Sequence, residues 1–197
     1  HAHVNRPGWG KGLQLLGAWS ALPYEKPPEP LDMPLPTGGG LRNAAPAYEV
    51  GDLTLEHHFL ESSPMRVSAL RSLGAHANVF AIESLMDELS DASGQDPLAF
   101  RLKHLADPRA RHVLQKVSEM SNWHSRGDAG TGIGYGMAYA RYKNKAGYCA
   151  LVAQVEVSER VKVLKVWACV DAGKVVHSDG LHNQIEGGIL QAISWSL

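Results

Sequence analysis

The sequence predicts an α+β fold, because its helix-like and strand-like patterns occupy separate blocks of the chain. Between residues 71 and 123 apolar residues recur at helical spacing, and between residues 132 and 171 they recur with a period near two. The last residues, 179–197, return to helical spacing. Helices followed by consecutive strands are typical of the α+β class. A chain of 197 residues is also long enough to bury a hydrophobic core.

Composition excludes several kinds of partner. The formal net charge is −1, so the chain lacks the basic excess of a general nucleic-acid or membrane-surface binder. Its apolar runs are far shorter than the roughly 20 residues that span a bilayer, so no transmembrane segment is predicted.

Cys149 and Cys169 lie in apolar, strand-like runs and are predicted to be buried thiols.

The first 64 residues give mixed signals. Spacing of Leu13, Leu16 and Trp19 predicts a short helix over residues 11–22. Residues 23–46 are so rich in Pro and Gly that no regular pattern of backbone hydrogen bonds can form. We call this segment the Pro/Gly-rich arm and expect it to lie against another part of a larger protein. Residues 52–60 alternate well enough to predict a strand.

Residues 71–106 organise the middle of the chain. A turn around Leu73 and Gly74 leads into a helix predicted over residues 78–92, which Gly94 ends. Asp-Pro pairs at 96–97 and 107–108 predict the starts of two more helices, since Asp caps the free N–H groups and Pro fits the first helical position. The predicted inner faces of the three helices are Ile82, Leu85, Met86 and Leu89, then Leu98, Leu102 and Leu105, then Val113, Leu114, Val117 and Met120.

The polar, Gly-containing stretch 124–131 predicts a domain boundary near residue 127. Three strands follow, over the segments GIGYGMAYARY, CALVAQVEV and KVLKVWACVD, with a short hairpin between the last two. A helix is predicted over residues 179–197, with Asp179 as its cap and Ile185, Ile189, Ala192 and Ile193 as its inner face. This pattern stops without a C-cap, from which we expect truncation.

Most familiar catalytic and metal motifs are absent from the sequence. The glycines at 132, 134 and 136 are followed by no helix that could cradle a phosphate, and the ten histidines include no HExxH pair. Two signals remain. Arg71, at the turn before a helix, could clamp an anion, although a surface or carbonyl-binding arginine explains it equally well.

The second signal is Gln184 beside Gly187 and Gly188. Each glycine in a helix interior costs about 1 kcal/mol relative to Ala, which indicates close approach of a ligand or of another helix. Helix packing is the commoner cause, while the Gln184 amide would suit the edge of a heterocyclic ring because it both donates and accepts hydrogen bonds.

Three collinear segments, residues 69–111, 132–142 and 170–197, resemble the large, molybdenum-cofactor-binding subunit of the xanthine dehydrogenase/aldehyde oxidase family. The likeness is to its bacterial branch of enzymes with two subunits, which includes isoquinoline 1-oxidoreductase and nicotinate dehydrogenase. It implies a truncated molybdenum cofactor-binding fold. Residues 1–127 would be the C-terminal part of one molybdopterin-binding domain, and residues 128–197 the start of a second.

The resemblance implies an oxidoreductase that hydroxylates an aldehyde or N-heterocyclic carbon with water-derived oxygen. The implied cofactor is molybdenum-molybdopterin, in its cytosine dinucleotide form. The implied partners are a small [2Fe-2S] subunit and a cytochrome or other electron acceptor. We expect the bacterial cytoplasm as the location, with the periplasm or a membrane-associated complex as the alternatives. A non-catalytic relative or scaffold chain that retains the molybdopterin-binding fold is the alternative.

By the same resemblance, Arg71 lies near the molybdenum and substrate, Leu73 lines the substrate pocket, and Gln184 contacts the pterin. The chain itself supplies no metal ligand. The Gly-Glu-Pro segment with the base glutamate is missing, as are the G-G-x-E-x-x-Q-G pterin loop and the Gly-Phe segment, and Glu186 lies in a different motif. We therefore expect this chain alone to bind no cofactor and to be inactive.

Overall fold

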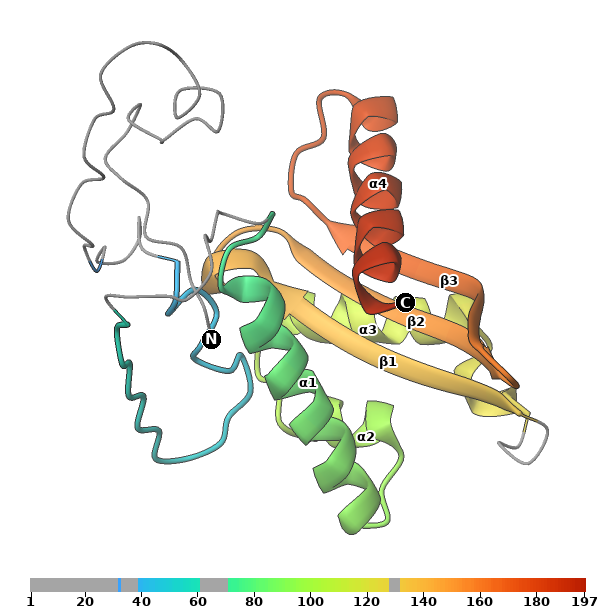
Figure 1. Ribbon diagram of the computed structural model, residues 1–197, viewed down its shortest axis with the longest axis horizontal. Helices are drawn as coiled ribbons and strands as arrows, with labels where there is room; N and C mark the ends of the chain where they lie inside the picture. Colours follow the sequence, from blue (N-terminus) through green and yellow to red (C-terminus); the bar gives the residue numbers. More distant parts are fainter. Residues whose placement is uncertain (1–31, 33–38, 61–70, 128–131) are drawn as a thin grey trace, which may run out of the picture. The chain divides into compact units, whose positions relative to one another are not determined.

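The computed structural model describes residues 32, 39–60, 71–127 and 132–197, which belong to two compact units. The first unit includes residues 39–46, 51–60 and 71–82 (Figure 1). The second includes residues 47–50, 83–127 and 132–197. The helix predicted over residues 11–22 lies outside the described residues.

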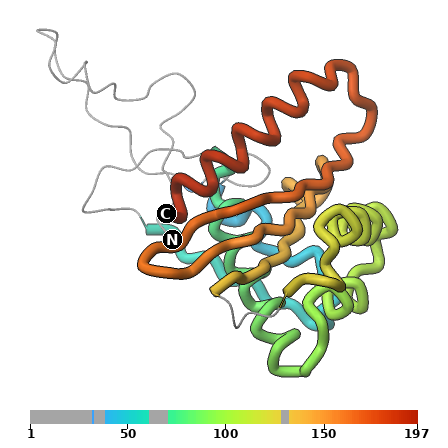
Figure 2. The backbone as a smooth tube through the Cα atoms, turned by 90° about the vertical axis from the view of Figure 1, so that its right-hand side faces the viewer, coloured from blue at the N-terminus to red at the C-terminus, as the bar shows by residue number. Residues whose placement is uncertain are grey.

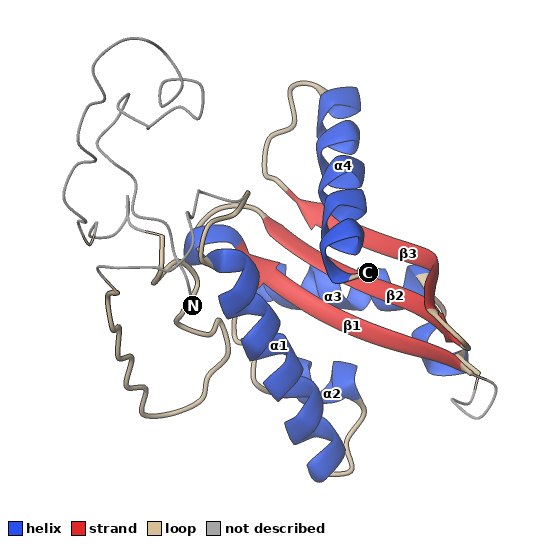
Figure 3. Ribbon diagram, in the orientation of Figure 1, coloured by secondary structure: helices blue, strands red, loops and turns tan. Residues whose placement is uncertain are grey.

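The elements confirm the α+β class (Figure 3). The described helices and strands are α1 (Ala75–Ala92), α2 (Pro97–Lys103), α3 (Pro108–Met120), β1 (Ile133–Arg141), β2 (Tyr148–Val157), β3 (Val161–Asp171) and α4 (Ser178–Ser196). Single 3₁₀ turns cover Trp123–Ser125 and Tyr142–Asn144. The boundaries predicted for the central helices and the strands are therefore close to those observed.

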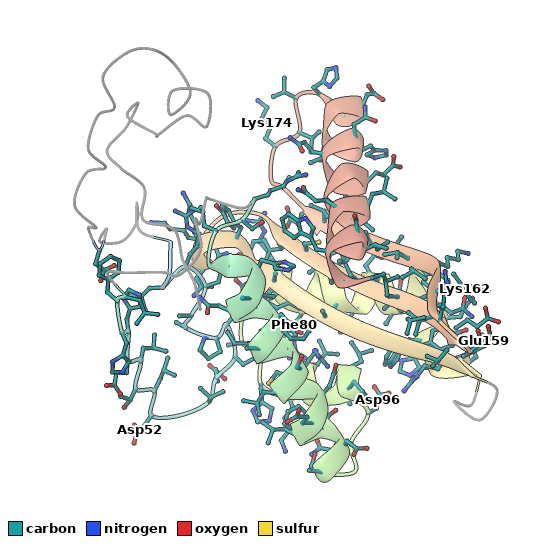
Figure 4. All side chains as sticks on the ribbon, in the orientation of Figure 1. Asp52, Phe80, Asp96, Glu159, Lys162 and Lys174 are labelled. Atoms are coloured by element: carbon teal, nitrogen blue, oxygen red, sulfur yellow. The ribbon has the colours of Figure 1, made fainter. Side chains whose placement is uncertain are left out.

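The helix ends follow the capping chemistry that the sequence predicts. The Asp96 carboxylate, labelled in Figure 4, accepts hydrogen bonds from the backbone N–H groups of Leu98 and Ala99 at the start of α2. Asp107 accepts from the N–H of Arg109 in the same way. Gly94 adopts a left-handed φ of 63° just after α1, a conformation that costs glycine little.

The prediction of which face of α1 is buried is wrong for two of its leucines. Leu85 and Leu89 are 52% and 44% exposed, whereas Glu83 is buried. The reason is that Glu83 finds an internal partner in Arg101, which is itself fully buried on α2. The spacing of hydrophobic residues along the sequence does not reveal such a buried ion pair. Met120, the last residue of the stripe predicted for α3, is also exposed.

The strands form one antiparallel sheet in the order β1-β2-β3. Met137 pairs with Val152 and Tyr139 with Ala150, so these side chains share one face of the sheet. Figures 1 and 2 show α3 against one face of the sheet and α4 on the other. The buried residues between the sheet and α3 are Ala110, Val113, Leu114, Val117, Met137, Tyr139, Tyr148, Ala150 and Val152.

Two other expectations are corrected. Residues 52–60 form no strand. Alternation alone does not make a strand, because its backbone must pair with a neighbouring strand, and no described strand pairs with residues 52–60. The cap of α4 is His177 rather than Asp179, since the Nδ1 atom of His177 accepts the N–H of Gly180 at 2.7 Å. Asp179 lies in the first turn of α4 instead.

Candidate functional site

Arg71 and Leu73 lie in one tight turn, residues 71–74, directly before α1 in the first unit. Ser72 and Leu73 have φ values of 72° and 56°. Left-handed backbone is uncommon for residues other than glycine and is strained for a bulky side chain such as leucine. Arg71 is exposed and Leu73 is half-buried. Strain of this kind often occurs at functional sites, where the surrounding structure maintains it.

A second segment of the first unit packs directly against this turn. The N–H of Gly74 donates to the carbonyl of Gly39 at 3.0 Å. A Cβ atom on Gly74 would lie 2.8 Å from the carbonyl oxygen of Gly40 and even closer to that of Gly39, so only glycine fits. The end of the Pro/Gly-rich arm thus contacts this chain's own turn. Residues 23–31 and 33–38 of the arm lie outside the described residues, so the expectation that the arm lies against another part of a larger protein stays a prediction.

Gln184 lies in the second unit, on the exposed surface of α4. Gly187 is one turn further along the helix, and a Cβ atom there would meet no described atom within 4 Å apart from the adjacent residues and the nearby helix backbone. Packing against another described helix therefore does not explain Gly187. The helix surface at Gly187 is open, and the Gln184 amide beside it could donate and accept hydrogen bonds.

An ion pair holds the end of β3, from which the chain leads to α4. The Nε and NH2 atoms of Arg109 donate to the two carboxylate oxygens of Asp171 at 2.7 and 2.6 Å. These hydrogen bonds, together with one from the N–H of Gly173, lower the pKa of Asp171 to about 2. Sequence reasoning did not link Arg109 to Asp171, because they are 62 residues apart.

Among the described residues, neither a metal-binding cluster nor the surface depression described below involves the predicted site residues. The described residues contain no group of three or more His, Cys, Asp or Glu side chains that could hold a metal ion. A surface depression of about 530 Å³ lies between α2 and α3, with His112, Lys116 and His124 in its lining, and includes none of the predicted site residues. No described helix has the length and hydropathy required to cross a membrane.

The match to a known family covers most of the chain. Residues 68–197 match the molybdopterin cofactor-binding domain, and the chain belongs to this family. The family resemblance inferred from the sequence is thereby confirmed.

Two curated relatives share substantial identity with the chain. It is 40% identical over 136 residues to the beta subunit of isoquinoline 1-oxidoreductase from Brevundimonas diminuta, in an alignment that covers 66% of this chain and 17% of that protein. It is 36% identical over 184 residues to a nicotinate dehydrogenase subunit from Pseudomonas putida, covering 79% of this chain and 15% of that protein. The chain thus spans about a sixth of the length of these relatives.

Proposed function

We propose that this chain is part of a longer molybdenum hydroxylase subunit, in which its residues contribute to the binding of substrate and cofactor. The observation that carries the proposal is the strained turn at residues 71–74, which presents Arg71 on a backbone supported by glycine contacts. Membership of the molybdopterin cofactor-binding family supports it. The division into a first cofactor-binding domain up to residue 127 and a second from residue 128 is part of the same proposal.

The residues of α4 fit a pterin. The open helix surface at Gly187 leaves room for a flat ring, and Gln184 offers an amide that matches a ring edge. When bound, the molybdenum cofactor would supply hydroxylation chemistry, in which the oxygen added to the substrate carbon comes from water and two electrons leave the substrate. The cytosine dinucleotide form of the cofactor is part of this proposal.

The chain's own residues would bind and orient the reactants. The guanidinium of Arg71 is charged at every working pH and carries five donors, so it would stabilise negative charge that develops on the substrate. Leu73 would form an apolar wall of the substrate pocket, and Gln184 would hydrogen-bond the pterin. The proton-abstracting glutamate would come from outside residues 1–197.

The names of the relatives support a proposal for the substrate class and the partners. These names refer to isoquinoline and nicotinate, both N-heterocyclic compounds, and to enzyme subunits. We propose an aldehyde or N-heterocycle as substrate and a small [2Fe-2S] subunit as electron acceptor. A cytochrome or other acceptor would act beyond it, and the enzyme would work in the bacterial cytoplasm.

Arg71→Met in the full-length subunit with its electron-accepting partner tests the role of Arg71. The change keeps an apolar stem but removes the donors, and loss of one well-placed electrostatic donor costs about 10²–10³ in turnover. Turnover would be measured on a panel of aldehydes and N-heterocycles, including isoquinoline and nicotinate, and expressed per bound molybdenum.

Arg160→Met is the matched control, because Arg160 is exposed in the hairpin between β2 and β3. The control should leave turnover unchanged. A structural arginine at position 71 would instead lower stability and cofactor content. If Arg71→Met leaves turnover per molybdenum within about threefold of wild type, far short of the expected loss, the catalytic assignment is wrong.

A further inference from the structure

The side chain of Asn78 joins the two segments that meet at the Arg71 turn. Asn78 lies in the first turn of α1, and its backbone N–H donates to the carbonyl of Gly74 at 3.0 Å. Its Nδ2 atom donates to the carbonyl of Gly40 at 2.8 Å and to that of Arg42 at 2.9 Å. Both hydrogens of this amide are therefore used to hold a segment 36 to 38 residues earlier in the chain.

Residues 39–42 are held against the turn at three carbonyls. Gly39 accepts from the N–H of Gly74, and the other two bonds come from Asn78. The segment itself turns tightly, because the N–H of Arg42 donates back to the carbonyl of Gly39 at 3.2 Å. Residues 39–42 thus form a wall against which Gly74 is packed without room for a side chain.

Only an amide of this size suits position 78. Alanine would leave two part-buried carbonyls without their side-chain donor, and aspartate would place a carboxylate against them. Asn is also a less favourable residue than Ala within a helix, so its helix propensity does not explain its presence. Its two bonds to the wall provide the physical reason.

A backbone with two consecutive left-handed residues persists only where its surroundings hold it. Loosening the wall would allow Ser72 and Leu73 to relax toward ordinary φ values, and Arg71 would move with them. A displacement of about 1 Å of a group that orients a reactant can cost about 10² in rate. The position of Arg71 therefore depends on bonds made by a residue seven positions away.

We infer that Asn78 is a positioning residue, which fixes the wall at residues 39–42 and thereby the turn that presents Arg71 to the substrate. This inference rests on the function proposed above. Both amide hydrogens of Asn78 are taken by backbone carbonyls, so this residue would act through the turn rather than directly on a reactant.

The first test is hydrogen exchange in the full-length subunit, which needs no substrate. Asn78→Ala and Asn78→Asp should accelerate exchange of the Gly74 amide at least tenfold, because the carbonyl of Gly39 is no longer held in place. Asn122→Asp is the matched control: Asn122 is exposed, and its side chain makes no capping hydrogen bond. Unchanged exchange at Gly74 in both Asn78 variants would overturn the inference.

The second test is a double-mutant cycle in the holoenzyme with its electron-accepting partner, on the fastest substrate of the same panel. Asn78→Ala alone should lower kcat per bound molybdenum tenfold or more. In the Arg71→Met background the same change should cost less than twofold, because the residue through which Asn78 acts is already gone. Equal losses in both backgrounds would show that Asn78 acts independently of Arg71 and would overturn the inference.

The experiments distinguish failure of the catalytic role proposed for Arg71 from failure of the positioning role inferred for Asn78. If Arg71→Met alone leaves turnover unchanged, the catalytic role of Arg71 is wrong, and the role inferred for Asn78 in catalysis falls with it. Gly74 exchange would still show whether Asn78 holds the turn. If Arg71→Met lowers turnover and Asn78→Ala does not, only the positioning role is wrong.

Discussion

At the scale of single residues, the buried carboxylate of Glu83 connects four parts of the second unit. Its Oε1 atom accepts from the hydroxyl of Tyr48 at 2.7 Å. Its Oε2 atom accepts from Arg101 Nε at 3.0 Å and from the N–H of Tyr139 at 2.9 Å. Burial raises the pKa of Glu83, while the positive charge of Arg101 and the surrounding donors act in the opposite direction. The bonds link residues 47–50, the part of α1 from Glu83 onward, α2 and β1.

Arg101→Met should destabilise the second unit strongly. Removal of one partner leaves a buried charge uncompensated, which typically costs about 3–5 kcal/mol in the free energy of unfolding. Urea unfolding followed by tryptophan fluorescence would measure it, since Trp123 is buried in this unit. The double variant Arg101→Met with Glu83→Gln should recover part of the loss, because no isolated charge remains.

Lys116→Met provides the control, since it breaks the exposed pair between Lys116 and Glu119 on α3. Exposed pairs contribute little to stability. An unfolding midpoint for Arg101→Met as close to wild type as that of this control would show that the buried network is not needed.

At the scale of elements, the pair between Arg109 and Asp171 connects the start of α3 to the end of β3. The guanidinium of Arg109 also lies over the ring of Tyr148, 4.6 Å from its centre. The Tyr148 hydroxyl donates to Asp107, the cap of α3, at 2.8 Å. Charge-assisted and ring contacts thus fix the point from which the chain leaves the sheet toward α4.

This pair predicts a pH dependence. The pKa of Asp171 is about 2 in the folded chain, against about 3.9 for an ordinary Asp side chain. A lowered pKa means that the stabilisation is complete above the unfolded value and is lost as the pH falls through the folded value. Asp171→Asn should therefore be less stable than wild type at pH 7, and this difference should shrink as the pH falls below about 4, with most of it lost at pH 2.

Urea unfolding midpoints of wild type and Asp171→Asn, compared from pH 7 down to pH 2, check this expectation. The same series on Asp52→Asn serves as the control, because Asp52 is exposed in the first unit (Figure 4). A wild-type advantage over Asp171→Asn that persists unchanged at pH 2 would contradict the role of the charged pair.

At the scale of the whole molecule, we predict that the isolated chain of residues 1–197 retains no stoichiometric molybdenum. Arg71 and Gln184 would supply only part of a binding site formed by many loops, and the chain spans 15–17% of its curated relatives. Metal analysis of the purified chain, with the full-length subunit as the positive control, measures this directly. Molybdenum bound one to one would show that residues 1–197 contain the complete binding site.

The sequence by itself determined the helix and strands in the second half of the chain, the ends of the central helices, and the family to which the chain belongs. Caps such as Asp96 and Asp107 act within three residues, and hydrophobic period is a property of consecutive residues. These signals are local, so the chain carries them before it folds. Arg71 and Gln184 were singled out from their local sequence and Leu73 from the family resemblance, and the roles of all three stay predictions.

The tertiary structure alone decided which faces are buried and what holds the Arg71 turn. Burial of Glu83 depends on Arg101, 18 residues away, and the bonds of Asn78 reach back as far as 38 residues. The absence of a strand at residues 52–60 likewise depends on the lack of a pairing partner among the described strands. Such features are set by pairs of groups that meet only when the chain folds, so a pattern read along consecutive residues does not contain them.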